Sequence, residues 1–428
     1  MAGEWRDVAL EDVADELTVG YVGPMASEYV DEGIPFLRSL NVNPLRINKN
    51  DLKFITPEFH SRIRKSRLTP GDVVIVRTGK PGACSVVPEW LADANCSDLV
   101  IVRCGPQLDN RFLAYYVNTV ACDHVAAHLV GAVQQHFNVG SARTLRLNLP
   151  PLPVQRAIAH ILGTLDDKIE LNRRMNATLE AMARALFQSW FVDFDPVRAK
   201  LDGRKPAALD PATATLFPEH LEDSPLGHIP LGWKAGTLVE GFNLTMGQSP
   251  PGDTYNEEGN GLPFYQGRTD FGFRFPTRRI YCSAPTRYAK PGDTLVSVRA
   301  PVGDINMANE ECCIGRGVAA VRHKSGATSF TYHSMANLYP DFARFEAEGT
   351  VFGSINKDGF EKLSFVIPPP QIVAAYERQA GPLDEQIRNL ENQSHTLATL
   401  RDTLLPKLLS GELSTERANE QMKEVLHA

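Results

Sequence analysis

A similarity between the two halves of the chain is the feature that most constrains its fold. The Ile-Pro-Phe step at 34–36 recurs as Leu-Pro-Phe at 262–264, and the Pro-Gly-Asp step at 70–72 recurs at 291–293. Farther along, a constant shift in numbering relates the copies: Asn138, Leu145, Pro150, Pro151, Leu165, Asp166 and Ile169 correspond to Asn356, Leu363, Pro368, Pro369, Leu383, Asp384 and Ile387. The sequence therefore predicts two similar folded units, each followed by a similar segment.

Each copy ends in a segment that is predicted to form a long helix. A proline-rich step precedes each segment, at 148–153 and at 365–370, and the first turn of a helix tolerates proline because its N–H is not needed there. Apolar residues then recur in steps of three and four, which is the spacing of a heptad. Helices of roughly 30 to 40 residues would be about 45 to 60 Å long. The predicted seam residues are Leu162, Leu165, Ile169, Asn172, Asn176, Leu179 and Leu186 in the first helix, and Leu383, Ile387, Leu390, Leu397 and Leu404 in the second.

The two seams suggest that the long helices pack against each other. Nothing else in the sequence offers them an apolar partner of matching length, so we expect an antiparallel coiled coil. Asn172 and Asn176 on the seam would reduce stability but fix the register of the pair. The alternative is that each helix packs on the core of its own domain, as most amphipathic helices do. The matched phase of the two seams favours mutual packing.

The predicted fold class is α+β, with two similar strand-rich α/β domains, two long antiparallel helices between them that form a coiled coil, and a pseudo-two-fold internal repeat. Short β-branched runs at 72–77, 99–103, 294–299 and 317–322 read as strands. The predicted boundaries are 1–150 for the first domain, 151–195 for the first spacer helix, 196–230 for a connector, 231–367 for the second domain, 368–410 for the second spacer helix and 411–428 for a C-terminal tail.

The composition is typical of a soluble globular protein. Hydrophobic residues make up 43% and charged residues 22% of the chain, without a run of roughly 18 apolar residues that could cross a bilayer. The N-terminal residues include acids and lack the apolar core of a signal peptide, so we expect a cytoplasmic location. The seven cysteines are odd in number and form no Cys-x-x-Cys pair, which disfavours both a disulfide framework and a zinc site.

The distribution of charge points to nucleic acid, although the formal net charge is −7. Six basic residues lie between Arg62 and Lys80 against the single acid Asp72. Seven lie between Arg268 and Arg299 against two acids. Because a phosphate responds to the local field rather than to the total charge, these tracts predict two basic surfaces. Double-stranded DNA is the commonest ligand that presents repeated sites to such a pair of surfaces.

The candidate DNA-contacting residues belong to these tracts and to polar loops near them. Arginine and lysine neutralise phosphates, while arginine, asparagine and glutamine pair with base edges in the major groove. Surface arginines are more often solvated than bound to bases, so we expect roughly a third of the candidates to touch DNA. The candidates are Arg62, Arg64, Lys65, Arg67, Arg77, Lys80, Gln134, Gln135, His136 and Asn138 in the first copy, and Gln266, Arg268, Arg274, Arg278, Arg279, Arg299, Arg316, Ser354 and Asn356 in the second.

The sequence contains no convincing catalytic motif. Residues 315–320 fit part of a dinucleotide-binding fingerprint, but Arg316 lies inside it and no acidic residue follows at the expected spacing of about 20. A tight turn is the simpler interpretation of these glycines. Neither a Walker-type loop nor a His-Glu-x-x-His step is present. We therefore expect no catalytic, cofactor-binding or metal-binding residue in this chain.

Seven segments, at 149–153, 155–159, 165–172, 186–194, 225–233, 247–251 and 400–413, occur in an order that is typical of one known family. Taken together, they resemble the specificity subunit of type I restriction-modification systems over nearly the full length of the chain. Each motif is weak by itself, but together and in this order they are highly specific. One departure is the start of the second helix, where Gln-Ile-Val-Ala-Ala at 371–375 replaces Gln-Arg-Ala-Ile-Ala at 155–159, so we expect partner contacts to differ between the helices.

The resemblance implies a subunit that has no activity of its own. Two target-recognition domains would each read one half of a split DNA sequence, and the two helices would act as a molecular ruler between them. Two methyltransferase subunits would bind the chain, carrying S-adenosylmethionine and modifying adenine. The complex could also include two restriction subunits, which would carry ATP and Mg²⁺.

Two other classes of function remain as alternatives. One is a coiled-coil scaffold that docks proteins on its helices and binds peptides with its duplicated domains. The other is a self-sufficient enzyme such as a methylating nuclease, which the missing motifs disfavour. Binding to duplex DNA, and methyl transfer by the purified chain alone, would distinguish these hypotheses.

Overall fold

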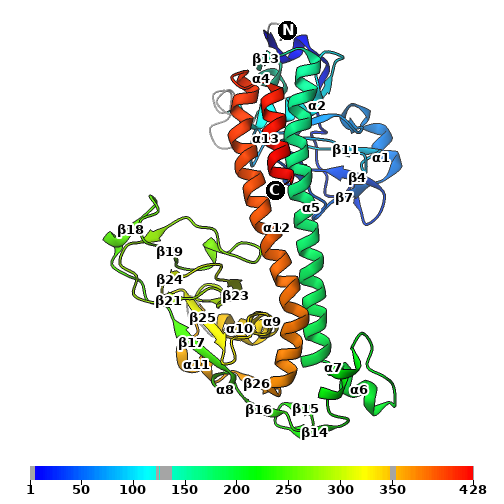
Figure 1. The fold of residues 1–428 in the computed structure, drawn as a ribbon. Coiled ribbons are helices and arrows are strands. Elements are labelled where there is room, and N and C mark those ends of the chain that lie inside the picture. Colours follow the sequence, from blue (N-terminus) through cyan, green and yellow to red (C-terminus); the bar gives the residue numbers. More distant parts are fainter. Residues whose placement is uncertain (1–4, 122–124, 126–136, 348–352, 428) are drawn as a thin grey trace. The chain divides into compact units, whose positions relative to one another are not determined.

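The computed structural model describes residues 5–121, 125, 137–347 and 353–427 (Figure 1). The chain divides into two compact units. Unit 1 comprises Met1–Leu171 and Gln393–Ala428, and unit 2 comprises Asn172–Asn392. Among the described residues, no helix combines the length and the hydropathy needed to span a membrane. Helices and strands are mixed in both units, which confirms the expected combination of α and β structure.

Two sheets form the centre of unit 1. The four-stranded sheet is antiparallel throughout and the five-stranded sheet contains one parallel pair, β4 with β11. The first has the order β10 (Cys84–Val86), β9 (Val73–Val76), β12 (Leu99–Cys104), β2 (Ala14–Val19), and the second β3 (Tyr29–Val30), β7 (Lys53–Ile55), β4 (Ile34–Leu37), β11 (Ala94–Cys96), β8 (Arg67–Leu68). Two further pairs are β1 (Arg6–Ala9) with β13 (Arg146–Leu149), and β5 (Val42–Asn43) with β6 (Arg46–Ile47).

The strands β9 and β12 are buried on both faces, and each face belongs to a different core. Val73 and Val100 pack with the helices, whereas Val74 and Ile101 pack toward the loops and strands of the other sheet. Alternate residues of a strand point to opposite faces, so a run of consecutive apolar residues is what this position requires. The burial of both faces therefore explains the unbroken valine and isoleucine runs in the sequence.

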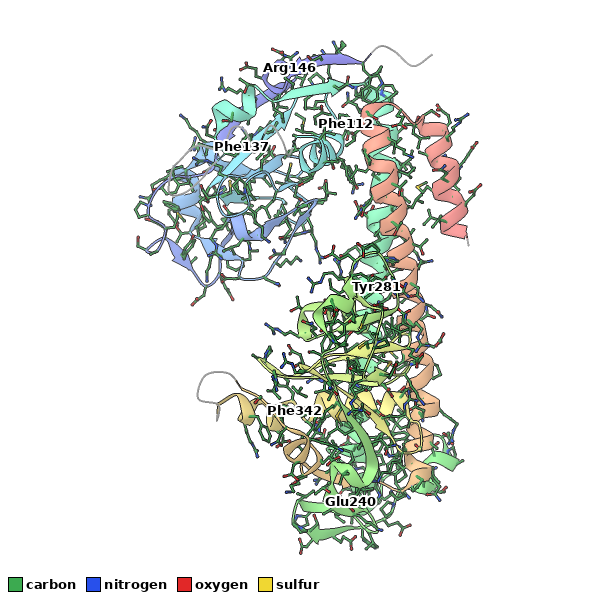
Figure 2. All side chains as sticks on the ribbon, turned by 90° about the vertical axis from the view of Figure 1, so that its left-hand side faces the viewer. Phe112, Phe137, Arg146, Glu240, Tyr281 and Phe342 are labelled. Atoms are coloured by element: carbon green, nitrogen blue, oxygen red, sulfur yellow. The ribbon has the colours of Figure 1, made fainter. Side chains whose placement is uncertain are left out.

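Most helices of unit 1 cover one face of the four-stranded sheet, whereas α1 packs through Phe59 on the five-stranded sheet. Asp109 caps α2 by accepting a hydrogen bond from Phe112 N at 2.9 Å. Phe112, labelled in Figure 2, is buried in the core of unit 1. The start of α5 and the end of α12 join the same core. The helices are α1 (Pro57–Arg62), α2 (Asn110–Thr119), α4 (Val139–Arg143), the start of α5 (Leu152–Phe191), the end of α12 (Pro370–Ser410) and α13 (Thr415–His427), with 3-10 turns at Leu10–Asp12, Ser39–Asn41 and Arg64–Ser66.

Unit 2 also contains a four-stranded antiparallel sheet and a five-stranded sheet with one parallel pair, here β19 with β24. The orders are β17 (Phe242–Met246), β25 (Val318–His323), β22 (Thr294–Val298), β23 (Val302–Met307), and β18 (Tyr255–Asn256), β20 (Tyr281–Cys282), β19 (Leu262–Tyr265), β24 (Cys312–Ile314), β21 (Tyr288–Ala289). The remaining pairs are β14 (Leu221–Ser224) with β15 (Gly227–Pro230), and β16 (Lys234–Thr237) with β26 (Ser364–Ile367).

The core of unit 2 is aromatic and is shared by the sheet and both long helices. Phe187 and Trp190 of α5 pack with Tyr376 of α12, and the Tyr376 hydroxyl donates to Ala183 O at 3.2 Å. Phe342, labelled in Figure 2, packs at 5.1 Å from Phe360. The other helices are α6 (Asp195–Leu201), α7 (Pro211–Leu216), α8 (Leu238–Gly241), α9 (Thr328–Asn337), α10 (Tyr339–Ala347) and α11 (Lys357–Glu361), with 3-10 turns at Gly252–Thr254 and Arg268–Asp270.

Two segments contain more regular structure than the sequence indicated. Residues 411–428 read as a tail, but α13 lies along the long helices in Figure 1 and buries Ala418 and Met422 in the core of unit 1. Gly411, at φ +79°, ends α12 and allows the chain to turn back. The connector at 196–230 likewise contains α6, α7 and the β14–β15 hairpin. Both segments are rich in charged and small residues, which hides their narrow apolar faces.

Candidate nucleic-acid interface

The first basic tract, residues 62–80, begins on α1 and ends in the turn after β9. Thr56 caps α1 by accepting from Phe59 N at 3.1 Å, which fixes where the helix starts. Arg62 leaves this helix, lies 4.9 Å from the Phe59 ring and pairs with Glu28 at 3.3 Å. Arg64 and Lys65, in the following 3-10 turn, are exposed. Arg62, Arg64 and Lys65 therefore lie close together in the sequence, at the end of a helix whose start is fixed by its N-cap.

The rest of the first tract is partly engaged within the unit. Arg67 pairs with Asp93 at 2.9 Å and remains half exposed. Arg77 is only 17% exposed and lies 3.6 Å from Asp98, so its position is set mainly by the fold. Lys80 is exposed in the turn between β9 and β10. Arg77 is therefore a weaker candidate for DNA contact than its neighbours.

The second basic tract, residues 268–299, presents arginines that are paired with acids at the surface. Arg268 lies 3.0 Å from Asp304, and Arg278 lies 2.5 Å from Glu310. Arg279 pairs with Asp270 at 3.0 Å. The guanidinium groups of all three are more than half exposed. Exposed pairs of this kind contribute about 0–1 kcal/mol, so a DNA phosphate can replace the carboxylate at little cost.

The prediction that Arg274 contacts DNA is wrong. Its side chain is completely buried and is paired with Glu180 of α5 and Asp384 of α12. The guanidinium also stacks 4.0 Å from the centre of the Tyr332 ring. A buried cation with two carboxylate partners has no surface to offer DNA. The sequence did not reveal this, because Arg274 sits in a tract whose other arginines are exposed.

The polar loop candidates separate into three groups. Gln134, Gln135 and His136 lie outside the described residues. Asn138 and Asn356 are N-caps, which accept hydrogen bonds at 2.8 Å from Ser141 N and Gly359 N respectively. Their matched positions in the sequence thus reflect helix capping. The remaining candidates are exposed, and they are Gln266, Arg299, Arg316 and Ser354.

The glycines on either side of Arg316 form a turn, as the sequence analysis predicted. Val318 N donates to Gly315 O at 3.0 Å, and β25 begins at Val318. A Cβ atom on Gly317 would lie 2.2 Å from Gln266 O, so close approach of the backbone to β19 requires glycine there. Arg316 is therefore held in a tight turn, and the glycines on either side of it lie against the Gln266 backbone.

Most of the predicted seam residues are buried. Four of the twelve, namely Ile169, Leu179, Leu186 and Leu383, are only partly buried. Asn172 donates to Leu390 O at 3.5 Å within unit 2. The fully buried seam residues are Leu162, Leu165, Asn172, Asn176, Ile387, Leu390, Leu397 and Leu404.

Two carboxylates of the long helices, the partly buried Asp166 and the buried Asp384, bind groups from other elements and were not predicted as a site from the sequence. In unit 1, Asp166 accepts from the Tyr115 hydroxyl at 2.5 Å and from Arg401 at 2.6 Å. Burial, together with the nearby Asp166 carboxylate, raises the pKa of Tyr115 well above its usual range. In unit 2, Asp384 accepts from Arg274. The internal repeat, which relates Asp166 to Asp384, was the only signal for this pair in the sequence.

A histidine beside this second carboxylate is buried without a hydrogen bond. His333 of α9 is 2% exposed, and neither ring nitrogen has a hydrogen-bond partner among the described residues. Its Nδ1 lies 4.0 Å from Glu180. Burial lowers the pKa of His333 to about 4, although Asp384 opposes the shift. The ring is therefore neutral at physiological pH.

The described residues contain no group of three or more His, Cys, Asp or Glu that could hold a metal ion. Five of the six described cysteines are buried, and all six are free thiols. Burial raises the pKa of Cys312 and of Cys104 to about 12, so these thiols are poor nucleophiles.

Comparisons with known proteins point to the same family. Residues 3–181 match the model described as the type I restriction modification DNA specificity domain. The chain is 25% identical over 425 residues to the putative type I restriction enzyme MjaX specificity subunit of Methanocaldococcus jannaschii, covering 96% of this chain and 94% of that protein. It is 27% identical over 325 residues to the type I restriction enzyme HindI specificity subunit of Haemophilus influenzae, covering 64% and 70%.

A solved structure shares the fold. The S subunit of a type I restriction-modification system from M. genitalium aligns with a TM-score of 0.62 at 16% identity, covering 95% of this chain and 96% of that one. The matched domain, one relative that aligns along nearly the whole chain and the shared fold agree with the order of motifs in the sequence. The chain is therefore similar to type I restriction-modification specificity subunits.

Proposed function

We propose that this non-catalytic subunit recognises a DNA sequence in two halves, one half-site being read by each of two target-recognition domains. The observation that carries the proposal is the strand order. Reading β10, β9, β12, β2 in unit 1 against β23, β22, β25, β17 in unit 2 gives the same order with the same antiparallel pairings. Two domains of one topology on one chain suit a ligand with two like sites.

Hydrogen bonds at matched positions support an internal repeat. Asp72 accepts from Thr69 N at 2.9 Å and Asp293 accepts from Lys290 N at 2.7 Å, three residues earlier in each case. An arginine one strand away, Arg103 or Arg322, pairs with each of these aspartates. Such agreement in detail favours duplication over two unrelated sheets.

We propose that α5 and α12 form an antiparallel coiled coil that acts as the spacer. In unit 1, Leu165 and Leu404 belong to one core, and in unit 2 Asn172 bonds to Leu390 O. Forty residues of helix correspond to about 60 Å. The proposed boundaries are 1–150 for domain 1, 151–195 and 368–410 for the spacer helices, 196–230 for the connector, 231–367 for domain 2 and 411–428 for the C-terminal segment.

The exposed basic residues of the two tracts are the proposed DNA contacts. Their surface ion pairs are weak and can exchange for phosphates, while Gln266, Arg316 and Ser354 are exposed polar groups that can reach base edges. Arg274 is excluded by its burial. Binding that depends on such contacts weakens steeply with salt.

The proposed partners follow from the family. Two methyltransferase subunits that carry S-adenosylmethionine would modify adenine where this chain positions them, and restriction subunits with ATP and Mg²⁺ would complete the assembly. A subunit that works on genomic DNA is expected in the cytoplasm.

The test is a genome-wide map of methylated adenines in cells that express the methyltransferase with and without this chain. We expect a motif of two short parts separated by a fixed gap. Removing four residues, about one turn, from α5 and four from the matched position of α12 should shorten the gap. Removing residues 203–206, in the exposed loop between α6 and α7, is the control and should leave the gap unchanged. A complex that binds no duplex even at low salt would favour a protein-docking scaffold instead.

A further inference from the structure

The loop between β19 and β20 contains a buried arginine among exposed ones. Arg274 is 0% exposed, whereas Arg278 and Arg279, four and five residues later, are more than half exposed. The loop therefore has an inner anchor and an outer basic surface. Whatever fixes Arg274 also fixes the position of the two exposed arginines.

Arg274 joins three helices at one point. Its two terminal nitrogens pair with Glu180 of α5 and Asp384 of α12, and its guanidinium stacks on Tyr332 of α9. A planar guanidinium can bind two carboxylates and an aromatic face at once, whereas a lysine ammonium cannot reproduce that geometry.

The backbone on both sides of Arg274 is attached to the sheet. Met307 N, at the end of β23, donates to Arg274 O at 2.8 Å. The side chain of Asn306 donates to Gly272 O at 3.1 Å. Phe275 packs with Met307 and Tyr332. Sheet, loop and long helices of unit 2 thus meet at this residue.

Stability alone is a weak explanation for such an arrangement. Removing an arginine and two carboxylates from water is costly, and replacing a buried ion pair by apolar residues is often neutral or stabilising. Arg274 Nε and Asp384 Oδ2 also have no hydrogen-bond partner among the described residues. A fixed geometry is the feature that an apolar replacement would not supply.

The matched loop of unit 1 lacks this anchor. Arg46, which corresponds to Arg274 when the two Pro-Phe steps are aligned, is 49% exposed and makes a 3.3 Å pair with Glu170 of α5. A cavity of about 750 Å³ lies beside it, lined among others by Val86, Ala114 and Asp166. The corresponding positions in unit 2 are Met307, Tyr332 and Asp384, which are the residues that surround the Arg274 loop.

We infer that Arg274 is a positioning residue, which fixes the basic loop of domain 2 on the two spacer helices and thereby determines how strictly the second half-site is read. This inference rests on the proposed two-half recognition. Arg274 acts through Arg278 and Arg279 and touches no DNA itself. The first half-site does not depend on it.

The test uses the chain in complex with its methyltransferase. The double variant Arg274→Met/Asp384→Leu removes the buried pair and leaves only Glu180, which is 26% exposed to solvent, without its cation. Urea unfolding checks that the variant remains folded. We expect discrimination against wrong bases in the second half-site to fall about ten-fold or more, while the first half-site is read as before. Arg46→Met is the matched control in unit 1 and should leave both half-sites unchanged.

The salt dependence of duplex binding separates positioning from contact. A residue that neutralises a phosphate contributes about 0.9 to the slope of log K against log salt. We expect Arg268→Met to lower this slope and the double variant to leave it unchanged. A lower slope in the double variant, equal loss at both half-sites, or no loss at either would overturn the inference. A wild-type complex that shows no two-part motif would instead contradict the proposed function itself.

Discussion

The two units have the same strand order but are fastened to the long helices in different ways. In unit 1, Asp166 of α5 accepts hydrogen bonds from Tyr115 of α2 and from Arg401 of α12, so all three groups come from helices. In unit 2, the matched Asp384 accepts a hydrogen bond from Arg274 of a loop. At the tyrosine position stands His333, whose ring nitrogens have no hydrogen-bond partner in the part of the chain that the structure describes. The topology of a sheet can therefore be retained while the contact that anchors it is replaced.

The largest test of this difference is the loss of a single arginine from each unit. Arg274→Met leaves Asp384 buried without its cation, so we expect it to reduce the free energy of unfolding by about 3–5 kcal/mol. Arg46→Met breaks an exposed pair and should cost at most about 1 kcal/mol. Urea unfolding of both variants measures the contrast, and equal losses would show that burial does not distinguish the two arginines.

The next test compares the tyrosine of unit 1 with the histidine of unit 2. Tyr115→Phe removes a hydrogen bond to the Asp166 carboxylate, so a loss of about 1.5–3 kcal/mol in the free energy of unfolding is expected. His333→Phe removes no hydrogen bond and should cost less at neutral pH. If His333→Phe lowers the free energy of unfolding as much as Tyr115→Phe does, the stability of unit 2 depends on this position as much as that of unit 1, and the contrast is wrong.

Acid should weaken unit 2 through His333. Above pH 6.5 the ring is neutral in both states, but between pH 6.5 and about 4 only the unfolded chain binds the proton, so stability falls as pH falls. At pH near 5 the loss is about 2 kcal/mol. His333→Phe should remove this part of the pH dependence of urea unfolding, while replacing the exposed His160 of unit 1 by Gln should not.

The smallest expected effect concerns the polar seam of unit 2. Asn176 is buried, and its Oδ1 atom has no hydrogen-bond partner among the described residues, so Asn176→Leu should raise the free energy of unfolding by about 1 kcal/mol. Asn172→Leu removes the hydrogen bond to Leu390 O, so its free energy of unfolding should rise by less. Thermal unfolding of the two variants compares them, and a loss of stability in Asn176→Leu would contradict the argument.

The sequence was most informative where a pattern extends over many residues. The family resemblance was confirmed, and the combination of α and β structure was correct, because motif order and hydrophobic periodicity are local properties of the chain. Arg274 could not be placed in this way. Its burial depends on Glu180 and Asp384, which are distant from it in the sequence in either direction. Asn138 and Asn356 were noticed as repeat positions, but their role as caps appears only from hydrogen-bond geometry.

Helix α13 was missed for a related reason. Its sequence is dominated by charged and polar residues, and the apolar positions, such as Ala418 and Met422, find their partners only when the end of α12 lies beside them. A narrow apolar face in a charged segment is weak evidence by itself. The partner surface, which forms only on folding, supplies the missing information.

The discontinuous make-up of unit 1 has a consequence for biosynthesis. Unit 2 contains only residues 172–392, whereas the core of unit 1 also requires Leu404, Leu408 and Met422. A nascent chain emerging from the ribosome can therefore complete unit 2 first. Until translation is nearly finished, an apolar face of the N-terminal sheets stays exposed. Ribosome stalling or premature termination near residue 400 would leave that face open to aggregation.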